Sequence, residues 1–283
     1  MPTLVELKTN STVIAIAPEV GGRIVQFTDR NSGYDFLWRN SAVPLRKEIP
    51  GADYDPNFFG GIDELLPNDI PEVIGNANFP DHGELWTAEF SYQQISESIL
   101  EMNTHLPIVG FHVTRRIALK DESCRVETKI TNLGSETRPF LWKLHVALAI
   151  RPGDEIGCDA TRFSIADTKW SRRNSDGIWS GEIVPEFDNS AEFLYLSGLK
   201  EGLMTWRRGQ KTFEVSFDPK VFKYAWYFAS YGGFEGHEVA ILEPATAMPI
   251  SVNEAARLGQ CSVLAPGASL ETAYTYCGVV HEN

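Results

Sequence analysis

Cysteine is scarce in this 283-residue chain, and no two cysteines have the Cys-x-x-Cys spacing of a metal or redox motif. The four cysteines are scattered along the sequence: Cys124, Cys158, Cys261 and Cys277. Their spacing argues against a thiolate zinc site, a redox pair and a disulfide framework.

Clusters of positive charge and long apolar runs are also lacking. The net charge is −13 and acidic residues are spread throughout, so no basic stripe is available to bind the phosphate backbone of a nucleic acid. No segment approaches the roughly 18–20 apolar residues of a membrane helix, and residues 1–6 lack the features of a signal peptide. We therefore expect a soluble, cytoplasmic protein that binds neither nucleic acid nor membrane.

Helical periodicity is rare, whereas alternation of apolar and polar residues recurs from end to end. The pattern predicts an all-β protein, and polar breaks at residues 120–123 and 132–135 predict hairpins and antiparallel sheets. Hydrophobic residues make up 43% of the chain, enough to bury a large core. All-β folds of this length commonly form one domain, so we expect a single domain over residues 1–283.

Two segments interrupt the strand pattern, and we predict a loop at each. Residues 39–61 contain three prolines, and residues 67–81 combine Pro71, Gly75 and Pro80 with polar side chains. Loops this long are uncommon in compact domains and often form the rim of a functional cleft, although tolerated insertions are the alternative. We favour a cleft rim, and the strands that resume on either side argue against a linker between domains.

Residues 81–86 bring an imidazole, two carboxylates and an indole together around a glycine. A glycine turn lets the backbone approach a ligand, and tryptophan beside polar groups can hold the C–H face of a sugar ring. His82 and Glu84 are therefore candidate site residues. The alternative is a plain loop in which Asp81 caps a turn and Trp86 starts the next strand.

A histidine stands out on the strand expected over residues 140–150. Large apolar residues alternate along this segment and define the face that we expect in the core. His145 falls on the opposite face beside Lys143 and Ala147, which leaves room for a ligand above the sheet. Imidazole is suited to donating and accepting protons near neutrality. A solvated or hydrogen-bonded histidine on an outer sheet face is the alternative.

A carboxylate ends the apolar strand expected over residues 239–242. Glu243 follows that strand directly, and Pro244 then stops its hydrogen-bonded ladder. Semi-buried carboxylates commonly have raised pKa values and act as bases near pH 7. The alternative is an ordinary structural ion pair with an arginine.

Further charged residues lie near glycines and turns. Asp63 and Glu64 precede the second long loop, and Arg23 follows a pair of glycines. Each is a candidate ligand contact, although a carboxylate could instead cap a turn or pair with Arg23. A metal is disfavoured because no second histidine lies at ligand spacing from His82, and no phosphate-binding glycine loop is present. We expect no cofactor.

Five motifs, taken in order, resemble those of the aldose 1-epimerase (galactose mutarotase-like) superfamily. They are Gly21-Gly22-Arg23-Ile24, Gly61-Ile62-Asp63-Glu64-Leu65-Leu66-Pro67, Asp81-His82-Gly83-Glu84-Leu85-Trp86, Trp142-Lys143-Leu144-His145 and Leu242-Glu243-Pro244. The resemblance covers most of the chain. It implies a β-supersandwich, a large two-layered antiparallel structure with a sugar-binding cleft on one face.

The resemblance also implies a reaction, the interconversion of the α- and β-anomers of a sugar. In that family a carboxylate takes the proton of the C1 hydroxyl while a histidine protonates the ring oxygen, so the ring opens and recloses. Carried over by motif, Glu243 is the expected base, His145 the expected acid, and His82 a residue that holds hydroxyls or polarises the ring oxygen. The expected substrate contacts are Arg23, Asp63, Glu64, Glu84 and Lys143.

Two departures from the family pattern bear on the substrate. Galactose-type members have asparagine before each active histidine, whereas Asp81 and Leu144 stand here. Members that act on hexose 6-phosphates often have an arginine soon after the first His-Gly, whereas Glu84 follows here and would repel an added anion. We therefore expect a neutral monosaccharide as the small-molecule partner.

Two rival functions remain open from the sequence. A carbohydrate hydrolase or lyase could pair Glu243 with Asp63 or Glu64, but cleavage of a polymer needs a long groove lined with exposed aromatic residues. A non-catalytic sugar-binding protein could keep the fold and the cleft. The presence of both His145 and Glu243 favours the epimerase over the binding protein.

Overall fold

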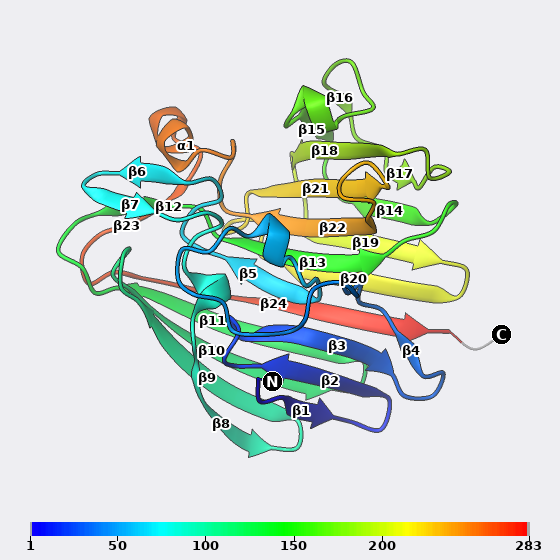
Figure 1. Ribbon diagram of the computed structural model, residues 1–283, viewed down its shortest axis with the longest axis horizontal. Helices are drawn as coiled ribbons and strands as arrows, with labels where there is room; N and C mark the ends of the chain where they lie inside the picture. The colour runs from blue at the N-terminus through cyan, green and yellow to red at the C-terminus, as the bar shows by residue number, and fades with distance from the viewer. Residues whose placement is uncertain (1, 282–283) are drawn as a thin grey trace.

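The computed structural model describes residues 2–281. Strands dominate it, and most of them belong to two large antiparallel sheets (Figure 1). The alternation in the sequence explains these strands, because successive side chains of a strand point to opposite faces. Along Phe111–Lys120, for example, buried residues alternate with more exposed ones without a break.

The first sheet has eleven strands, and its centre holds the strands that carry the predicted acid and base. In spatial order they are β1 (Val5–Lys8), β2 (Thr12–Ala17), β3 (Arg23–Asp29), β5 (Ile62–Leu65), β13 (Lys143–Ala149), β22 (Glu238–Ala245), β21 (Tyr224–Tyr231), β18 (Ser190–Ser197), β15 (Arg162–Ile165) and β16 (Gly177–Ile178), with β4 (Tyr34–Asp35) paired to β3.

The second sheet has nine strands and lies against the first. In spatial order they are β17 (Glu182–Ile183), β14 (Glu155–Cys158), β19 (Leu203–Arg208), β20 (Lys211–Phe217), β24 (Ser269–Val280), β11 (Ser123–Asn132), β10 (Phe111–Lys120), β9 (Ile99–Leu106) and β8 (Ser91–Ser96).

Short elements complete the described part of the chain. They are the two-stranded sheets β6 (Glu72–Ile74) with β7 (Ala77–Phe79) and β12 (Arg138–Phe140) with β23 (Ser262–Leu264), the helix α1 (Val252–Leu258), and the 3-10 turns η1 (Asp55–Asn57), η2 (Leu85–Thr87) and η3 (Thr168–Trp170). Within residues 2–281, no helix is long and apolar enough to cross a membrane.

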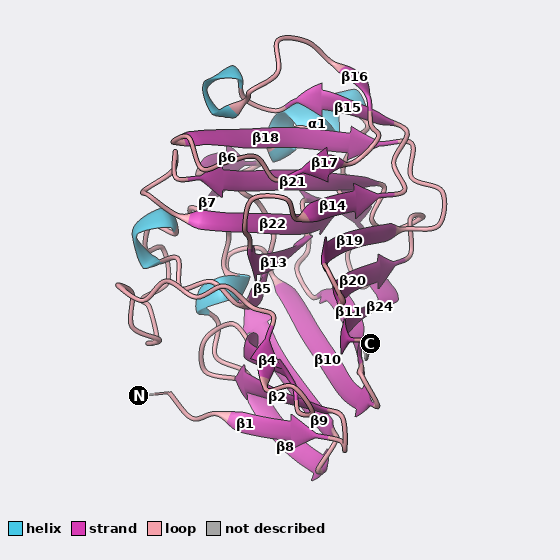
Figure 2. Ribbon diagram, turned by 90° about the vertical axis from the view of Figure 1, so that its right-hand side faces the viewer, coloured by secondary structure: helices cyan, strands magenta, loops and turns pink. Residues whose placement is uncertain are grey.

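A shared hydrophobic core joins the two sheets, which form two layers in the side view of Figure 2. Phe27 of the first sheet meets Phe213 of the second edge-to-face, with ring centroids 5.2 Å apart. Such contacts bury large aromatic area and favour one relative placement of the layers. The predicted all-β sandwich with large antiparallel sheets is confirmed.

Two predictions about local structure are wrong in detail. The sequence pattern favours a strand over residues 34–38, but only Tyr34–Asp35 form one, and Leu37 makes an isolated bridge with Leu148. The Asp35 carboxylate instead accepts the backbone N–H groups of Phe27 and Leu37. Residues 67–81 are not a plain loop, because they contain the hairpin of β6 and β7. In both places the backbone N–H groups bond to a side chain or to a very short strand. The alternation of apolar and polar residues does not indicate such bonds.

Candidate active site

Three central strands of the first sheet place the predicted acid and base side by side. The pairing of β5 with β13 sets Asp63 opposite His145. The pairing of β13 with β22 sets Lys143 opposite Ala245 and Val146 opposite Leu242, so His145 lies opposite Glu243. Directly opposite residues point to the same face, with Cβ atoms about 4.5–5.5 Å apart. The three side chains therefore form one row across the sheet.

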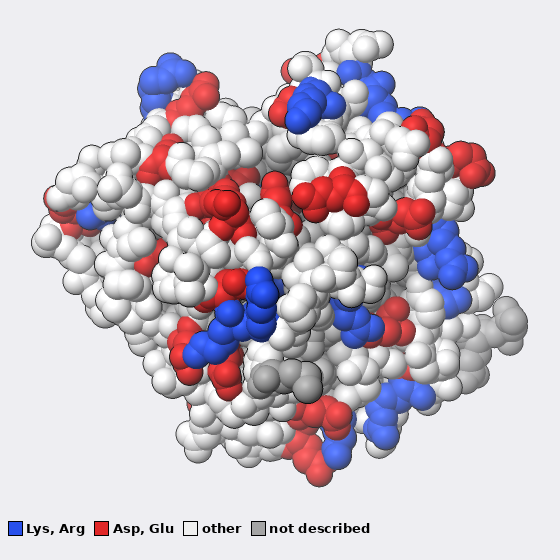
Figure 3. All heavy atoms as spheres, viewed as in Figure 1, with Lys and Arg blue, Asp and Glu red and all other residues white. Residues whose placement is uncertain are grey.

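A cavity of about 290 Å³ opens above this row. Its polar wall is formed by Asp69, His82, Lys143, His145 and Glu243, with Asp55, Asp81 and Asp167 around it. Both segments predicted as a cleft rim line the cavity. Acidic side chains gather near the middle of the same face in Figure 3, over the strands of the first sheet.

The rest of the cavity wall is apolar and largely aromatic. Its rings belong to Phe58, Trp170, Phe193, Phe228 and Phe234. Phe228 and Phe234 pack edge-to-face at 5.5 Å, and Trp170 packs against Phe234 at 5.6 Å. A ligand in this cavity therefore meets both charged groups and aromatic rings.

His145 is held by a buried carboxylate. Its Nδ1 lies 3.0 Å from Asp63 Oδ1 and 3.2 Å from the Tyr54 hydroxyl, which leaves Nε2 for a ligand. Asp63 Oδ2 in turn accepts from Arg23 Nη2 at 2.5 Å and from Tyr54 at 2.8 Å. Burial works against the charged form, but Arg23 and His145 outweigh it and lower the pKa of Asp63. Asp63 and Arg23 thus orient the imidazole.

Glu243 is paired with a lysine from the neighbouring strand. Lys143 Nζ lies 2.6 Å from Glu243 Oε2 and 3.1 Å from Asp69 Oδ1. All three side chains are at least nine-tenths buried. Burial disfavours the ammonium, but Asp69 and Glu243 outweigh it and hold the pKa of Lys143 above its usual range. The expected base therefore stands in a buried cluster of alternating charge.

His82 is engaged by carboxylates at both ring nitrogens. Nδ1 lies 2.9 Å from Asp81 Oδ1 and Nε2 lies 3.3 Å from Asp69 Oδ1, while the ring stacks on Tyr54 at 4.3 Å. Burial disfavours its charged form, but Asp69 and the hydrogen bond with Asp81 raise the pKa of His82. The structure places His82 at the cavity wall as predicted, but as a partner of carboxylates.

Two of the predicted substrate contacts lie away from the cavity. Glu64 follows Asp63 on β5 and therefore points to the other face, where it accepts from Trp142 Nε1 at 2.9 Å and pairs with Arg115. Glu84 accepts the backbone N–H groups of residues 108 and 109, each at 2.9 Å. Their predicted contact with substrate does not agree with this placement.

Arg23 and Trp86, which the sequence also suggests for the site, do not line the cavity themselves. Arg23 is buried behind Asp63, to which it donates, and is not part of the cavity wall. Trp86, expected to hold a sugar face, is 2% exposed and packs edge-to-face on Tyr54. Arg23 therefore holds Asp63 beside His145, and Trp86 supports Tyr54, so both position residues of the site from behind.

Sequence reasoning missed two polar residues of the site, Tyr54 and Asp69. Both come from the predicted rim segments, where no periodicity indicates which side chain turns inward. A weak signal was present for Tyr54, which is the sole tyrosine in residues 39–61. Asp69 carried no signal, because its contacts with His82 and Lys143 join positions far apart in the chain.

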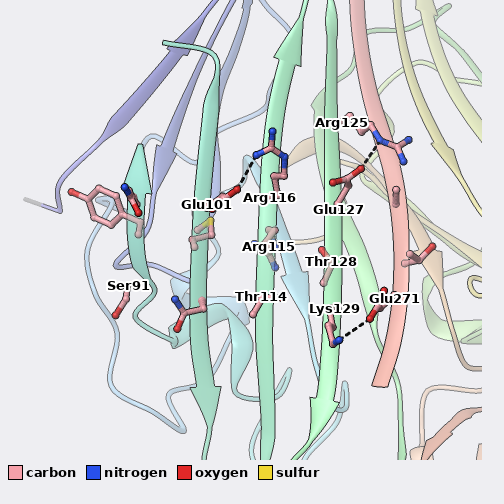
Figure 4. Close-up of a pocket in the computed structure, with 16 residues that line it drawn as sticks. Ser91, Glu101, Thr114, Arg115, Arg116, Arg125, Glu127, Thr128, Lys129 and Glu271 are labelled. Carbon is pink, nitrogen blue, oxygen red and sulfur yellow. Dashed lines mark hydrogen bonds and ion pairs between the residues drawn. The ribbon is translucent and has the colours of Figure 1, made fainter. Parts of the chain in front are cut away.

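A larger hollow of about 900 Å³ lies on the solvent face of the second sheet (Figure 4). Its charged side chains pair with one another at the surface, as Arg116 does with Glu101 at 2.8 Å and Lys129 with Glu271 at 2.7 Å. Its lining residues, all within the described chain, include no histidine. The hollow is therefore an ordinary solvated sheet face, and the smaller cavity is the candidate site.

The architecture defines a galactose mutarotase-like β-sandwich, and comparison with solved structures confirms this fold. A candidate aldose 1-epimerase from Escherichia coli K12 matches with a TM-score of 0.77 and 17% identity, over 99% of each chain. Slr1438 from Synechocystis sp. PCC 6803 matches with a TM-score of 0.78 and 16% identity, over 99% of this chain and 97% of that one.

A galactose mutarotase-like protein from Lactobacillus casei ATCC 334 is a third such neighbour. Its TM-score is 0.70 at 16% identity, over 98% of this chain and 100% of that one. No protein-family model and no curated protein matches the chain. The predicted resemblance to the galactose mutarotase-like superfamily is thus confirmed in the fold, and the site must be argued from its own residues.

Proposed function

We propose that the protein is an aldose 1-epimerase, which interconverts the α- and β-anomers of a sugar. The observation that carries the proposal is the placement of His145 and Glu243 opposite each other on adjacent strands, beneath one cavity. A histidine and a carboxylate on one floor can reach two oxygens attached to the same anomeric carbon. The galactose mutarotase-like fold agrees with this reading.

The reaction needs only proton transfers. Glu243 accepts the proton of the C1 hydroxyl while Nε2 of His145 gives a proton to the ring oxygen. The bond between C1 and the ring oxygen breaks, and the aldehyde forms. Rotation about C1–C2 presents the other face, after which the two protons return and the ring closes. General acid–base catalysis contributes about 10²–10⁴-fold to such a step.

The surroundings of His145 favour its role as the acid. Asp63 accepts from Nδ1, so the proton that moves is the one on Nε2. Arg23 and Tyr54 hold Asp63 in place, which fixes the orientation of the histidine.

The cavity favours an uncharged sugar. Asp55, Asp69, Asp81 and Asp167 line it together with the base, so a phosphorylated sugar would meet like charge. The aromatic wall of the cavity offers ring faces to the C–H face of a pyranose. A neutral aldose is therefore the substrate class that both walls support.

The proposal is tested by NMR of freshly dissolved α-anomers of neutral aldoses. Wild-type protein should accelerate anomerisation of at least one sugar, and Glu243→Gln and His145→Ala should each lower the rate constant by about 10²-fold or more. Glu271→Gln, which removes an exposed carboxylate from the outer hollow, is the matched control and should behave as wild type.

Two results would argue for the rival functions. Chemical-shift changes that show sugar binding without acceleration would indicate a non-catalytic binding protein. Release of a shorter sugar from an oligosaccharide, lost in Glu243→Gln, would indicate a hydrolase or lyase.

A further inference from the structure

Lys143 lies on the same face of β13 as His145 and reaches the floor of the cavity. The sequence predicts it as a substrate contact. A lysine ammonium has three N–H donors and no acceptor, so its partners can be counted. The groups that already surround the ammonium indicate whether Lys143 contacts the substrate or another part of the protein.

The ammonium of Lys143 is already surrounded by charged and aromatic groups of the protein. Nζ lies 2.6 Å from Glu243 Oε2, 3.1 Å from Asp69 Oδ1 and 4.5 Å from the centre of the Trp226 ring. A cation within about 6 Å of an indole face is attracted by it. Two carboxylates and an indole face therefore compete with any sugar hydroxyl for the ammonium, which favours a role within the protein.

The lysine also separates two buried carboxylates. Asp69 and Glu243 share it, and each has a side chain that is less than 5% exposed. Without the cation, two negative charges would face each other in a poorly solvated site, and one of them would take up a proton. A protonated Glu243 could not accept the C1 proton.

We propose that Lys143 is a positioning residue that keeps Glu243 in its basic form and fixes one carboxylate oxygen so that the other faces the sugar. This inference rests on the proposed function, because it assigns Lys143 a task in the same reaction. It replaces the predicted direct contact between Lys143 and substrate.

Other ionisable groups face Glu243 from the elements packed around it. They are His145 on β13, Asp69 from residues 67–81, Tyr54 from residues 39–61 and Tyr195 on β18. Burial raises the pKa of both tyrosines, so they stay neutral over the pH range of the assay. His82 pairs with Asp69 and so affects the charge near Glu243 through that carboxylate. Lys143 is the permanent cation among these groups.

The test compares two variants with opposite expected effects. Lys143→Met keeps the length of the side chain and removes its charge, so the acid limb of the pH profile of kcat/KM should move up by about one to three pH units. Asp69→Asn keeps the ion pair between Lys143 and Glu243 but removes the negative charge of Asp69. The acid limb of the pH profile should therefore move to lower pH. KM should stay near the wild-type value in Lys143→Met.

A readout independent of activity keeps this inference separate from the proposed function. Carbon-detected NMR can follow the carboxyl of Glu243, assigned by its absence in Glu243→Gln. The carboxyl should take up its proton at higher pH in Lys143→Met and at lower pH in Asp69→Asn. These shifts are expected even if no aldose turns over, in which case the proposed function alone fails.

Two results would overturn the inference. A raised KM in Lys143→Met with an unmoved acid limb would make Lys143 a substrate contact. Unchanged titration of Glu243 in both variants would leave the ion pair a purely structural one. If Lys143→Met does not fold, as judged by thermal unfolding, the downward shift in Asp69→Asn still decides the question.

Discussion

Asp63 controls which nitrogen of His145 can react. Its carboxylate accepts from Nδ1, and Arg23 keeps that carboxylate charged in a buried position. Asparagine has nearly the same shape but carries an N–H₂ group that can hold the imidazole in the other tautomer. The imidazolium would also lose its counter-charge.

Asp63→Asn should therefore lower kcat for anomerisation by about 10²-fold or more while KM changes little. The measurement is the NMR anomerisation assay at saturating sugar, beside a thermal unfolding scan of each protein. Glu84→Gln is a suitable comparison, because it removes a buried carboxylate that lies outside the cavity. Wild-type kcat in Asp63→Asn would exclude the orienting role.

The residues that could be predicted from sequence are those carried by strands. His145 and Glu243 stand on or at the end of alternating segments, so their faces follow from period-2 reasoning. The same rule should have separated Asp63 from Glu64, because neighbours in a strand cannot both face one cavity. Tyr54 and Asp69 escaped prediction because loop side chains follow no period.

A close backbone contact at Gly83 anchors the chain where the rim segment 67–81 ends. This residue has φ 76°, and a Cβ added there would lie 2.3 Å from the Leu66 carbonyl oxygen. That oxygen also accepts the N–H groups of Glu84 and Leu85, so it cannot easily move away. The contact fixes residues 81–85 beside the end of β5 and so places His82 at the cavity.

Gly83→Ala should lower the free energy of unfolding by at least about 2 kcal/mol, because a positive φ costs an L-residue about 1–2 kcal/mol and the clash adds to it. Urea unfolding measures the loss. Gly267→Ala is the matched control, since Gly267 has φ 74° with no atom near the added Cβ. Equal losses in both variants would show that the backbone angle, and not the contact, matters.

Strands and turns were the elements that local pattern could predict. The strand expected over residues 239–242, for example, lies within β22. The hairpin of β6 and β7 was missed because its three-residue strands are too short for a period to show. The break before β13 follows from a tertiary bond, in which the Trp142 N–H donates to the Thr246 hydroxyl.

A buried ion pair links the two layers of the molecule beneath the cavity. Glu64 on β5 of the first sheet pairs with Arg115 on β10 of the second at 2.8 Å, and it also accepts from Tyr274 on β24. All three side chains are nearly inaccessible to water. Glu64 thus serves the packing of the sheets, while its neighbour Asp63 serves the cavity on the other face.

Glu64→Gln should cost about 3–5 kcal/mol of unfolding free energy, because it leaves the Arg115 guanidinium buried without a counter-charge. The glutamine oxygen can still accept from Trp142, and its N–H₂ group can donate to the Tyr274 hydroxyl, so the loss reports mainly on charge. Adding Arg115→Met removes the uncompensated charge, and the double variant should be more stable than Glu64→Gln alone. Urea unfolding of the four proteins gives the coupling between the two residues.

The folded fraction of Glu64→Gln should anomerise sugar at the wild-type rate, because Glu64 faces away from His145. A fall in kcat without a fall in stability would place Glu64 in the site after all.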